Sequence, residues 1–205
     1  MSCSMRRFKG VKRVFDLLFV IPGLIVLVPV FVGVAVLIKL EGDGPVFFRQ
    51  TRVGYKGKLF KIWKFRTMYV DAEKRGLGIT VGQDPRITRA GRVLRKLKLD
   101  ELPQLVNVLL GEMSLVGPRP ELLRYVEKYT DQQRAVLLYS PGITDPASIQ
   151  FRNESEILAG ESDPDKVYIE RIMPEKIRIN LHYATRAGVF DDLAVIFKTI
   201  FAIAR

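Results

Sequence analysis

Two adjacent carboxylates, Asp100 and Glu101, have the residue types and the position to do chemistry. They precede a stretch in which leucine and valine recur at helical spacing, and Gly111 is expected to end that helix. Aspartate is a favoured N-cap, so Asp100 is expected at the helix start, where backbone amides favour an ionised group and attract phosphate. A carboxylate there can attack phosphorus or bind a divalent cation. A purely capping aspartate explains the same pattern, and on the pattern alone it is favoured.

Arg119 lies between Pro118 and Pro120, on a stiff backbone that has few conformations to lose. A guanidinium presented in this way can bind phosphate through two parallel hydrogen bonds. A surface arginine in a turn between helices fits the pattern equally well. Upstream, basic residues recur at helical spacing from Pro85 onward, which predicts a helix whose cationic face either contacts an anion or is simply solvated.

The composition limits the chemistry and the partners. Lysine and arginine number 33 against 22 acidic residues, a formal charge of +11, which favours an anionic partner such as nucleic acid, acidic lipid or a phosphorylated substrate. The single cysteine, Cys3, excludes an internal disulfide, and the single histidine, His182, argues against histidine-rich metal sites and Ser-His catalysis. With 205 residues, the chain is expected to form one functional unit.

Residues 17–38 contain no charged side chain, which is the strongest compositional feature. As a helix they would measure about 33 Å, enough to cross a hydrocarbon core of about 30 Å. The absence of a polar stripe argues against a soluble core helix, and the length argues against a signal peptide. Basic residues flank both ends, so charge does not set an orientation. Pro22 and Pro29 could bend the helix, so that it enters one leaflet and returns.

The predicted fold is α+β and mainly helical. A re-entrant or spanning membrane helix in residues 1–40 precedes a compact cytosolic domain in residues 41–205. Residues 46–53 and 58–65 read as two strands around a Gly-Tyr-Lys-Gly turn, which predicts a β-hairpin. The remaining expectations are an irregular loop at residues 69–84, a helix at 121–139, and an apolar stretch at 190–204 that either packs as core or lies on the membrane as an interfacial amphipathic helix.

Four motifs occur in order along the chain. They are Arg52-Val53-Gly54, KIWKFRTM at residues 61–68, the run at 84–120 that contains LDELPQL and GPRP, and PGIT at 141–144. Together they resemble the bacterial sugar transferase family, the monotopic phosphoglycosyl transferases that start glycan assembly on undecaprenyl phosphate. The likeness covers nearly the whole chain, from about Lys12 to Thr199, and LDELPQL with the spaced GPRP is its most specific part.

The resemblance implies a phosphotransferase that moves a sugar 1-phosphate from a UDP-sugar to undecaprenyl phosphate and releases UMP. Asp100 would be the nucleophile that carries the covalent phosphosugar, Glu101 would complete an Asp-Glu dyad, and Mg²⁺ would bind at Asp100. The family also implies a re-entrant helix, contact with membrane lipid at the cytoplasmic face of the bacterial inner membrane, and no nucleic-acid partner. Phosphate and substrate binding would fall to four basic residues: Lys64, Arg95, Arg119 and Arg152.

The chain departs from the family pattern at two places. The membrane helix carries Val28-Pro29 where members commonly have Ser-Pro, and Asp145-Pro146-Ala147-Ser148 follows PGIT where Gly-Trp-Ala-Gln is usual. The second difference bears on the donor sugar, which the sequence does not identify. The alternative interpretation is a membrane-anchored binding or scaffold protein, whose basic helix at residues 86–98 engages nucleic acid or acidic lipid and in which Asp100 is only a cap.

Overall fold

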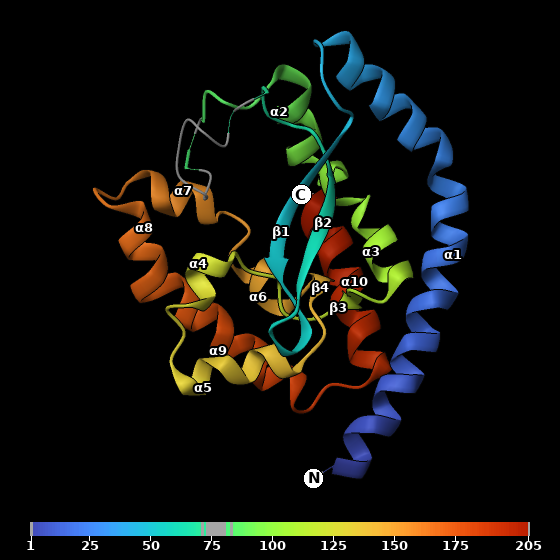
Figure 1. Ribbon diagram of the computed structural model, residues 1–205, viewed down its shortest axis with the longest axis vertical. Helices are drawn as coiled ribbons and strands as arrows, with labels where there is room; N and C mark the ends of the chain where they lie inside the picture. The colour runs from blue at the N-terminus through green and yellow to red at the C-terminus, as the bar shows by residue number, and fades with distance from the viewer. Residues whose placement is uncertain (1, 71, 73–80, 83, 205) are drawn as a thin grey trace.

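The longest element is helix α1 (Ser2–Leu40), in a computed structural model that describes residues 2–70, 72, 81–82 and 84–204. Pro22 and Pro29 lie inside α1 without interrupting it, and the helix curves along one side of the molecule (Figure 1). The sharp bend that re-entry would need is not seen, so how α1 meets a bilayer stays a prediction. Among the described residues, one helical segment, Gly10–Leu40, is long and apolar enough to cross a membrane, and an 18-residue window within it has a mean hydropathy of 2.8.

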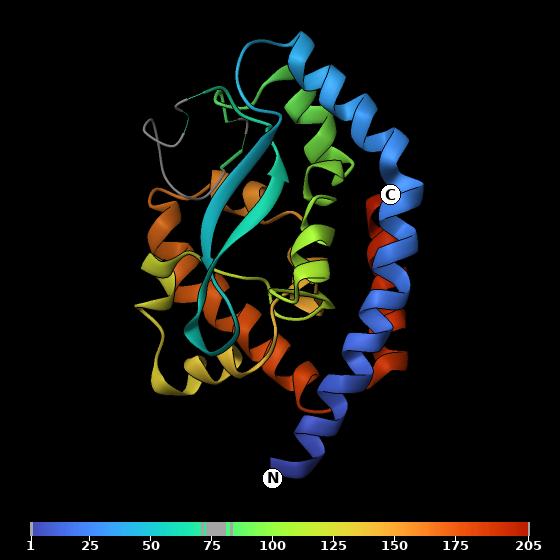
Figure 2. The same ribbon diagram turned by 45° about the vertical axis from the view of Figure 1, so that its right-hand side comes forward.

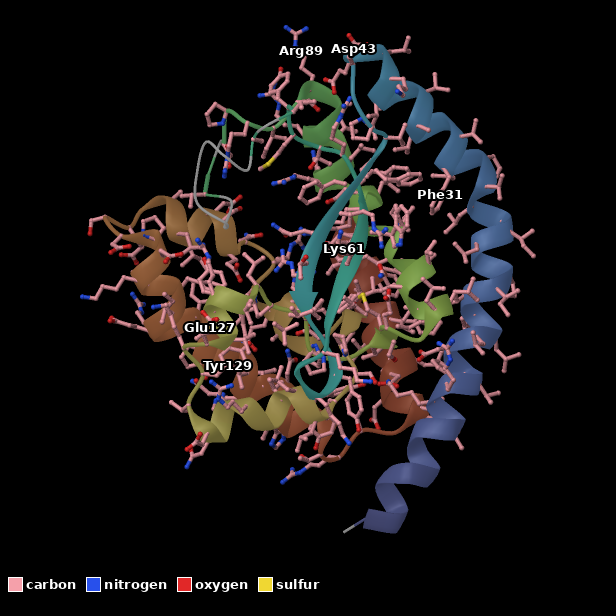
Figure 3. The ribbon with its side chains drawn as sticks, viewed as in Figure 1. Phe31, Asp43, Lys61, Arg89, Glu127 and Tyr129 are labelled. Carbon is pink, nitrogen blue, oxygen red and sulfur yellow. The ribbon has the colours of Figure 1, made fainter. Side chains whose placement is uncertain are left out.

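One face of α1 packs on the rest of the chain. Val20 is fully buried against a cluster that includes Ile62 and Val108. Further along the helix, Phe31 points toward the neighbouring strands (Figure 3), and its ring lies 5.2 Å from that of Phe65. These contacts join the predicted membrane segment closely to the rest, and the division of the chain at residue 40 stays a prediction.

Polar side chains fix the same face of α1. The Nη2 atom of Arg13 donates to the carbonyl of Leu109 at 2.7 Å. The carboxylate of Asp16, 3% exposed, accepts hydrogen bonds from Ser114 Oγ and from the Leu115 backbone N–H, each at 3.1 Å. Because buried polar groups need partners, these bonds set the rotation of α1 about its axis as well as its position.

The predicted hairpin is confirmed. Strand β1 (Phe47–Val53) pairs antiparallel with β2 (Leu59–Phe65), and the 3₁₀ turn η1 (Tyr55–Gly57) joins them. On β2, Phe60 and Ile62 are buried, as the period of two along a strand requires for one face. The hairpin runs through the middle of the molecule, and helix α3 (Gln104–Leu110) lies between it and α1 (Figure 1 and Figure 2).

Helix α2 (Arg89–Lys96) begins later than the predicted start at Pro85. The reason is local: Thr88 Oγ1 accepts the backbone N–H of Gly91 at 2.9 Å and caps the helix, while Arg86 is tied to Asp84 outside it. Most of the predicted loop at residues 69–84 lies outside the described residues.

After α2 come the 3₁₀ turn η3 (Leu99–Glu101) and helix α3 (Gln104–Leu110), which ends at Gly111 with φ of 81°, as predicted. Asn107, fully buried on α3, fastens this helix to β2. Its Oδ1 accepts a hydrogen bond from the backbone N–H of Trp63, and its Nδ2 donates to the backbone carbonyl of Lys61, both at 2.9 Å.

A second, parallel pair of strands was not predicted from the sequence. Strand β3 (Ser114–Val116) pairs with β4 (Gly142–Thr144) beyond the glycine-proline turns. Gly142 donates its N–H to the Pro118 carbonyl at 3.0 Å, and Gly117 donates to the Thr144 carbonyl at 3.0 Å. A Cβ atom on Gly142 would lie 2.1 Å from the Gly117 nitrogen, so the two turns touch backbone to backbone.

The remaining chain forms short helices around two longer ones. The single helix predicted at residues 121–139 is broken into three pieces, because Thr130 caps a new start in a capping box with Gln133. The pieces pack on the long helix α9 in the largest apolar cluster. These elements are α4 (Leu123–Val126), α5 (Asp131–Arg134), η4 (Ala135–Leu138), α6 (Pro146–Gln150), α7 (Glu154–Ala159), α8 (Pro164–Val167), the π-helical turn η5 (Tyr168–Ile172), α9 (Met173–Ala184) and α10 (Val189–Ala204).

The start of helix α10 approaches α1, where Lys12 pairs with Asp192, and both helices expose large apolar side chains. Phe190 is 87% exposed and Phe201 68%, values that a core helix would not show. The apolar stretch at residues 190–204 is therefore only partly core, since Val195 is buried on its inner face.

We expect Gly142→Ala to lower the free energy of unfolding by about 1–3 kcal/mol, because its Cβ would collide with backbone that cannot rotate away. Gly160 is a matched control: nothing lies within 4 Å of a Cβ added there, so Gly160→Ala should stay within about 0.5 kcal/mol of the wild type. Denaturant unfolding of the detergent-solubilised protein measures both. Equal stability of the two variants would refute the tight contact.

Candidate functional site

Asp100 lies in the turn η3 and does not cap α3. The N-cap position of α3 is Pro103, which makes no side-chain capping bond. The preceding Lys98 adopts a left-handed backbone with φ of 54°, which turns the chain sharply into η3. Asp100 is 6% exposed, and within the part of the chain that the structure describes its Oδ1 atom is buried without a hydrogen-bond partner. The capping interpretation of this residue is wrong.

Glu101 is buried beside Asp100, and both of its carboxylate oxygens accept hydrogen bonds from cations. Lys64 Nζ donates to its Oε1 at 2.7 Å. Arg119 grips the same carboxylate with two nitrogens, Nη1 to Oε2 at 3.1 Å and Nη2 to Oε1. The two carboxylates that the sequence places side by side thus differ: one is paired with two cations, and the other is free on one oxygen.

The cations come from separate elements. Lys64 follows Phe60 and Ile62 at intervals of two residues, so it points to the buried face of β2, where an apolar residue is expected. Arg119 leaves β3 on the turn held against Gly142, and its side chain is 31% exposed. The surface-turn interpretation of Arg119 is therefore incomplete, because this guanidinium both pairs internally and reaches solvent.

Arg95 comes to the site from the last turn of α2. Its Nε donates to Thr67 Oγ1 at 2.9 Å, and α2 lies close to this segment because Gly91 leaves no Cβ against the Thr67 carbonyl. Burial lowers the pKa of the Arg95 guanidinium, while its attraction to Asp100 opposes that change. The charge of Arg95 therefore acts on the Asp100 carboxyl.

The surroundings drive the two carboxyl pKa values apart. Burial first, and then the charge of Glu101, raise the pKa of Asp100, against the attraction of Lys64 and Arg95. Burial alone would also raise the pKa of Glu101, but Arg119 and Lys64 outweigh it and hold that pKa well below the usual range. Two neighbouring carboxyls with opposite shifts are typical of a site in which they have different roles.

Two groups near the site were missed in the sequence. Arg52, at the end of β1, donates to the Pro120 carbonyl at 3.3 Å and so supports the turn that carries Arg119. Thr67 orients Arg95. Arg52 and Thr67 lie in two of the motifs shared with the family. Their contacts join residues far apart in the chain, so the neighbouring sequence does not reveal them. Arg152, predicted to bind substrate, is exposed before α7 and makes no hydrogen bond or ion pair with this cluster among the described residues, so its role stays a prediction.

The carboxylates at the site are too few to bind a metal ion by themselves, so a substrate would have to supply further oxygen ligands. Within the described ranges, no three His, Cys, Asp or Glu side chains come together as metal ligands. Among the buried carboxylates that the structure describes, Asp100 has an oxygen without a hydrogen-bond partner. Mg²⁺ commonly binds through one or two carboxylates and completes its shell with phosphate oxygens and water. The residues would therefore fit Mg²⁺ with Asp100 as its protein ligand.

Known proteins resemble this chain over nearly its whole length. The model of the family described as bacterial sugar transferase matches residues 7–205. The chain is 37% identical over 194 residues to the UDP-glucose:undecaprenyl-phosphate glucose-1-phosphate transferase of Escherichia coli (strain K12), which covers 93% of this chain and 39% of that relative. It is equally 37% identical over 194 residues to the UDP-N-acetylgalactosamine-undecaprenyl-phosphate N-acetylgalactosaminephosphotransferase of Aeromonas hydrophila, covering 93% of this chain and 43% of the relative.

A relative of similar length is the exopolysaccharide production protein PSS of Rhizobium leguminosarum bv. phaseoli. It is 39% identical over 197 residues, 92% of each chain. By contrast, the chain spans about two fifths of the length of the Escherichia coli and Aeromonas relatives. The shared part is the part that contains Asp100, Glu101 and Arg119.

In metal-free buffer, Asp100→Asn and Glu101→Gln should change stability in opposite directions. The raised pKa of Asp100 means that its charge opposes folding at neutral pH, so Asp100→Asn should raise the melting temperature. That gain should vanish as the pH falls below the unfolded pKa, where Asp100 is protonated in both states. Glu101→Gln should destabilise by about 3–5 kcal/mol, because it leaves two partly buried cations without their partner.

The ionised carboxylate of Glu101 stabilises the fold, whereas that of Asp100 opposes folding, so the two residues affect the pH dependence of stability in opposite directions. The lowered pKa of Glu101 stabilises the fold above the unfolded pKa, and this is lost as the pH falls through the folded pKa. Thermal unfolding of both variants with EDTA, followed between neutral and acidic pH, checks both signs. A destabilised Asp100→Asn variant at neutral pH would contradict the assignment of an unpaired charge.

Proposed function

The chain belongs to the bacterial sugar transferase family, and from this we propose that it transfers a sugar 1-phosphate from a UDP-sugar to undecaprenyl phosphate and releases UMP. One observation carries the proposal. Asp100 is a buried carboxylate with an unpaired oxygen among cations, beside a second carboxylate that is already neutralised. Such a group is suited to nucleophilic attack on a phosphate that the cations attract.

In the first step, an Asp100 oxygen attacks the sugar-bearing phosphorus of the UDP-sugar. A bond forms between that oxygen and phosphorus, and the bond from phosphorus to the bridging oxygen breaks, so UMP leaves with the bridging oxygen. The enzyme then carries an aspartyl phosphosugar. In the second step, a phosphate oxygen of undecaprenyl phosphate attacks the same phosphorus, and Asp100 departs as a carboxylate. No proton transfer is needed in either step.

Glu101 acts through its partners. It keeps Arg119 and Lys64 at fixed positions, so their charges are in place before a diphosphate arrives and need no reorganisation. Arg95, oriented by Thr67, adds a third cation. Mg²⁺ bound at Asp100 would neutralise the diphosphate and the leaving UMP.

The second substrate is a lipid, and the exposed apolar surface suits it. α1 and α10 approach each other where Lys12 pairs with Asp192, and both present large apolar side chains to the outside. The cationic face of α2 would contact acidic headgroups at the cytoplasmic face of the bacterial inner membrane. The exposed apolar residues on the two helices include Leu18, Ile25, Val32, Phe190, Phe197 and Phe201.

The alternative of a basic binding or scaffold protein is not favoured. It requires Asp100 to be a helix cap, and Asp100 is not one. The relatives with catalytic names also share the region of the chain that contains the cluster. The absence of a nucleic-acid partner stays a prediction.

Asp100→Asn should abolish UMP release from UDP-sugars, by about a thousandfold or more, because an amide cannot form the acyl phosphate. Asp131→Asn serves as a control, since Asp131 is exposed at the start of α5 and lies outside the cluster. A panel of UDP-sugars, with and without Mg²⁺ and undecaprenyl phosphate, measures release. Intact mass should show one phosphosugar on the wild type without lipid. Wild-type UMP release by Asp100→Asn would reject the mechanism.

The pH dependence of kcat/KM at low Mg²⁺, where Asp100 carries no metal ion, should report the raised pKa of Asp100. Attack needs the ionised form, so the rate should rise with pH through that pKa, above the ordinary value of 3.8. Lys64→Met should move this acidic limb to higher pH, because it removes a charge that lowers the pKa, and should cut the rate about 100-fold. If the acidic side of the kcat/KM profile of Lys64→Met lies at the same pH as that of the wild type, a group other than Asp100 controls it.

A further inference from the structure

A second unpartnered side chain lies in the same helical run as Asp100. Gln104, the first residue of α3, is 1% exposed. In the part of the chain that the structure describes, its Nε2 atom is buried and has no hydrogen-bond acceptor. A buried donor that stays unpaired is costly, so this amide needs an explanation. The steps proposed for Asp100 give Gln104 no role.

Gln104 belongs to a buried stripe of polar residues. The backbone between η3 and α3 stays right-handed and helical. Residues three and four apart on such a backbone are neighbours, so Gln104 lies on the same face as Asp100 and Glu101. Asn107 lies one turn further along that face. All four side chains of this stripe are buried.

The members of this stripe differ in how completely they are paired. Asn107 is bonded at both ends of its amide, to the backbone of β2 and to Glu112. Glu101 is paired with two cations. Asp100 and Gln104, by contrast, each keep one atom without a partner among the described residues, an acceptor and a donor. The pairing separates two residues that stabilise the fold from two whose unpaired atoms suit a ligand.

The two unpaired atoms define what this ligand must offer. Gln104 Nε2 needs a hydrogen-bond acceptor, and Asp100 Oδ1 needs a donor, a cation or an electrophile. Because the two side chains lie one turn apart, one small group can satisfy both. A phosphoryl group does so, since its phosphorus is electrophilic and its oxygens are acceptors. A single water molecule would also satisfy both atoms, and kinetics distinguishes the two.

We propose that the Gln104 amide donates a hydrogen bond to a non-bridging oxygen of the phosphoryl group that is transferred to and from Asp100. This inference rests on the proposed function, which assigns the nucleophile. Gln104 forms no covalent bond and moves no proton. Its amide, held on the same helical face as the nucleophile, orients phosphorus toward Asp100 Oδ1 and stabilises the charge on the phosphoryl oxygens.

Single-turnover kinetics of Gln104→Met, in the full-length protein in detergent, test the proposal. Methionine has a similar length but no N–H, so formation of the phosphosugar enzyme should slow about 100-fold. Transfer from that enzyme to undecaprenyl phosphate should slow by the same factor, because the same phosphorus reacts in both steps. If only the formation step slowed, Gln104 would contact the phosphate that leaves with UMP, and the proposal would be wrong. Unchanged rates in both steps would point to a bridging water and would also overturn it.

The melting temperature separates a catalytic amide from a structural one. Gln104→Met removes an unpaired buried donor, so the melting temperature should equal that of the wild type or exceed it. Gln104→Leu shows whether the fit of the methionine matters. If both variants melt below the wild type, the amide has a structural partner and the proposal fails. Gln132→Met is the matched control, since Gln132 is exposed on α5, and it should change neither the rates nor the melting temperature.

Binding of inorganic phosphate requires no turnover and keeps the result separable from that of the proposed function. Calorimetry in the presence of Mg²⁺ should show phosphate binding about tenfold weaker in Gln104→Met than in the wild type, because one hydrogen bond to a phosphate oxygen is lost. Equal affinities would contradict the proposal. If the wild type formed no phosphosugar, the proposed function would fail, while this comparison would still report on Gln104.

Discussion

The carboxylate of Glu101 connects segments that lie far apart in the chain. It accepts hydrogen bonds from Lys64, on the central hairpin, and from Arg119, on the turn after β3. Removing three charged groups from water is unfavourable unless they pair, so each of these side chains constrains the position of the other two. Because both cations bind Glu101, Asp100 Oδ1 is left without a hydrogen-bond partner among the described residues. Burial first, and then the charge of Glu101, raise the pKa of Asp100. The reactivity proposed for Asp100 therefore depends on the complete pairing of Glu101.

The backbone around this cluster is as constrained as its charges. Gly117 and Gly142 touch without side chains between them, which holds the Arg119 turn against β4. Asn107 ties α3 to β2 and so fixes the distance between the turn η3 and Lys64. The turns that carry Asp100, Glu101 and Arg119 are thus each held by contacts with neighbouring strands, which is what the proposed reaction, driven by preorganised charge, would require.

Local patterns in the sequence predicted part of this structure. The hairpin, the apolar α1 and the end of α3 at Gly111 are confirmed, because strand alternation, an uncharged run and a C-terminal glycine each act over a few residues. The β3–β4 pair was missed, since two strands of three residues leave no periodic signal and meet across a long loop. The N-cap assignment of Asp100 was wrong because Pro103 starts the helix later, although capping propensity favoured the aspartate.

The site itself was predictable in a different way. Residue chemistry singled out Asp100, Glu101 and Arg119, whereas Lys64 and Arg95 came from the family resemblance, because a basic residue on a strand or helix does not reveal what it faces. Thr67 and Arg52 make contacts between distant segments, which one sequence does not reveal. Arg152 and Mg²⁺ stay predictions.

The contacts of α1 bear on how the molecule can be handled. Arg13 and Asp16 bind the end of α3 and the strand β3, and Val20 fills the apolar cluster beside them. Strand β3 leads directly into the turn that carries Arg119. Helix α1 is therefore a structural part of the domain rather than a separable membrane anchor. Excising residues 1–40 to obtain a water-soluble fragment would open an apolar trough along the hairpin and remove the brace behind β3. Nanodiscs or mild detergent, which keep α1 in place, suit this molecule better than truncation.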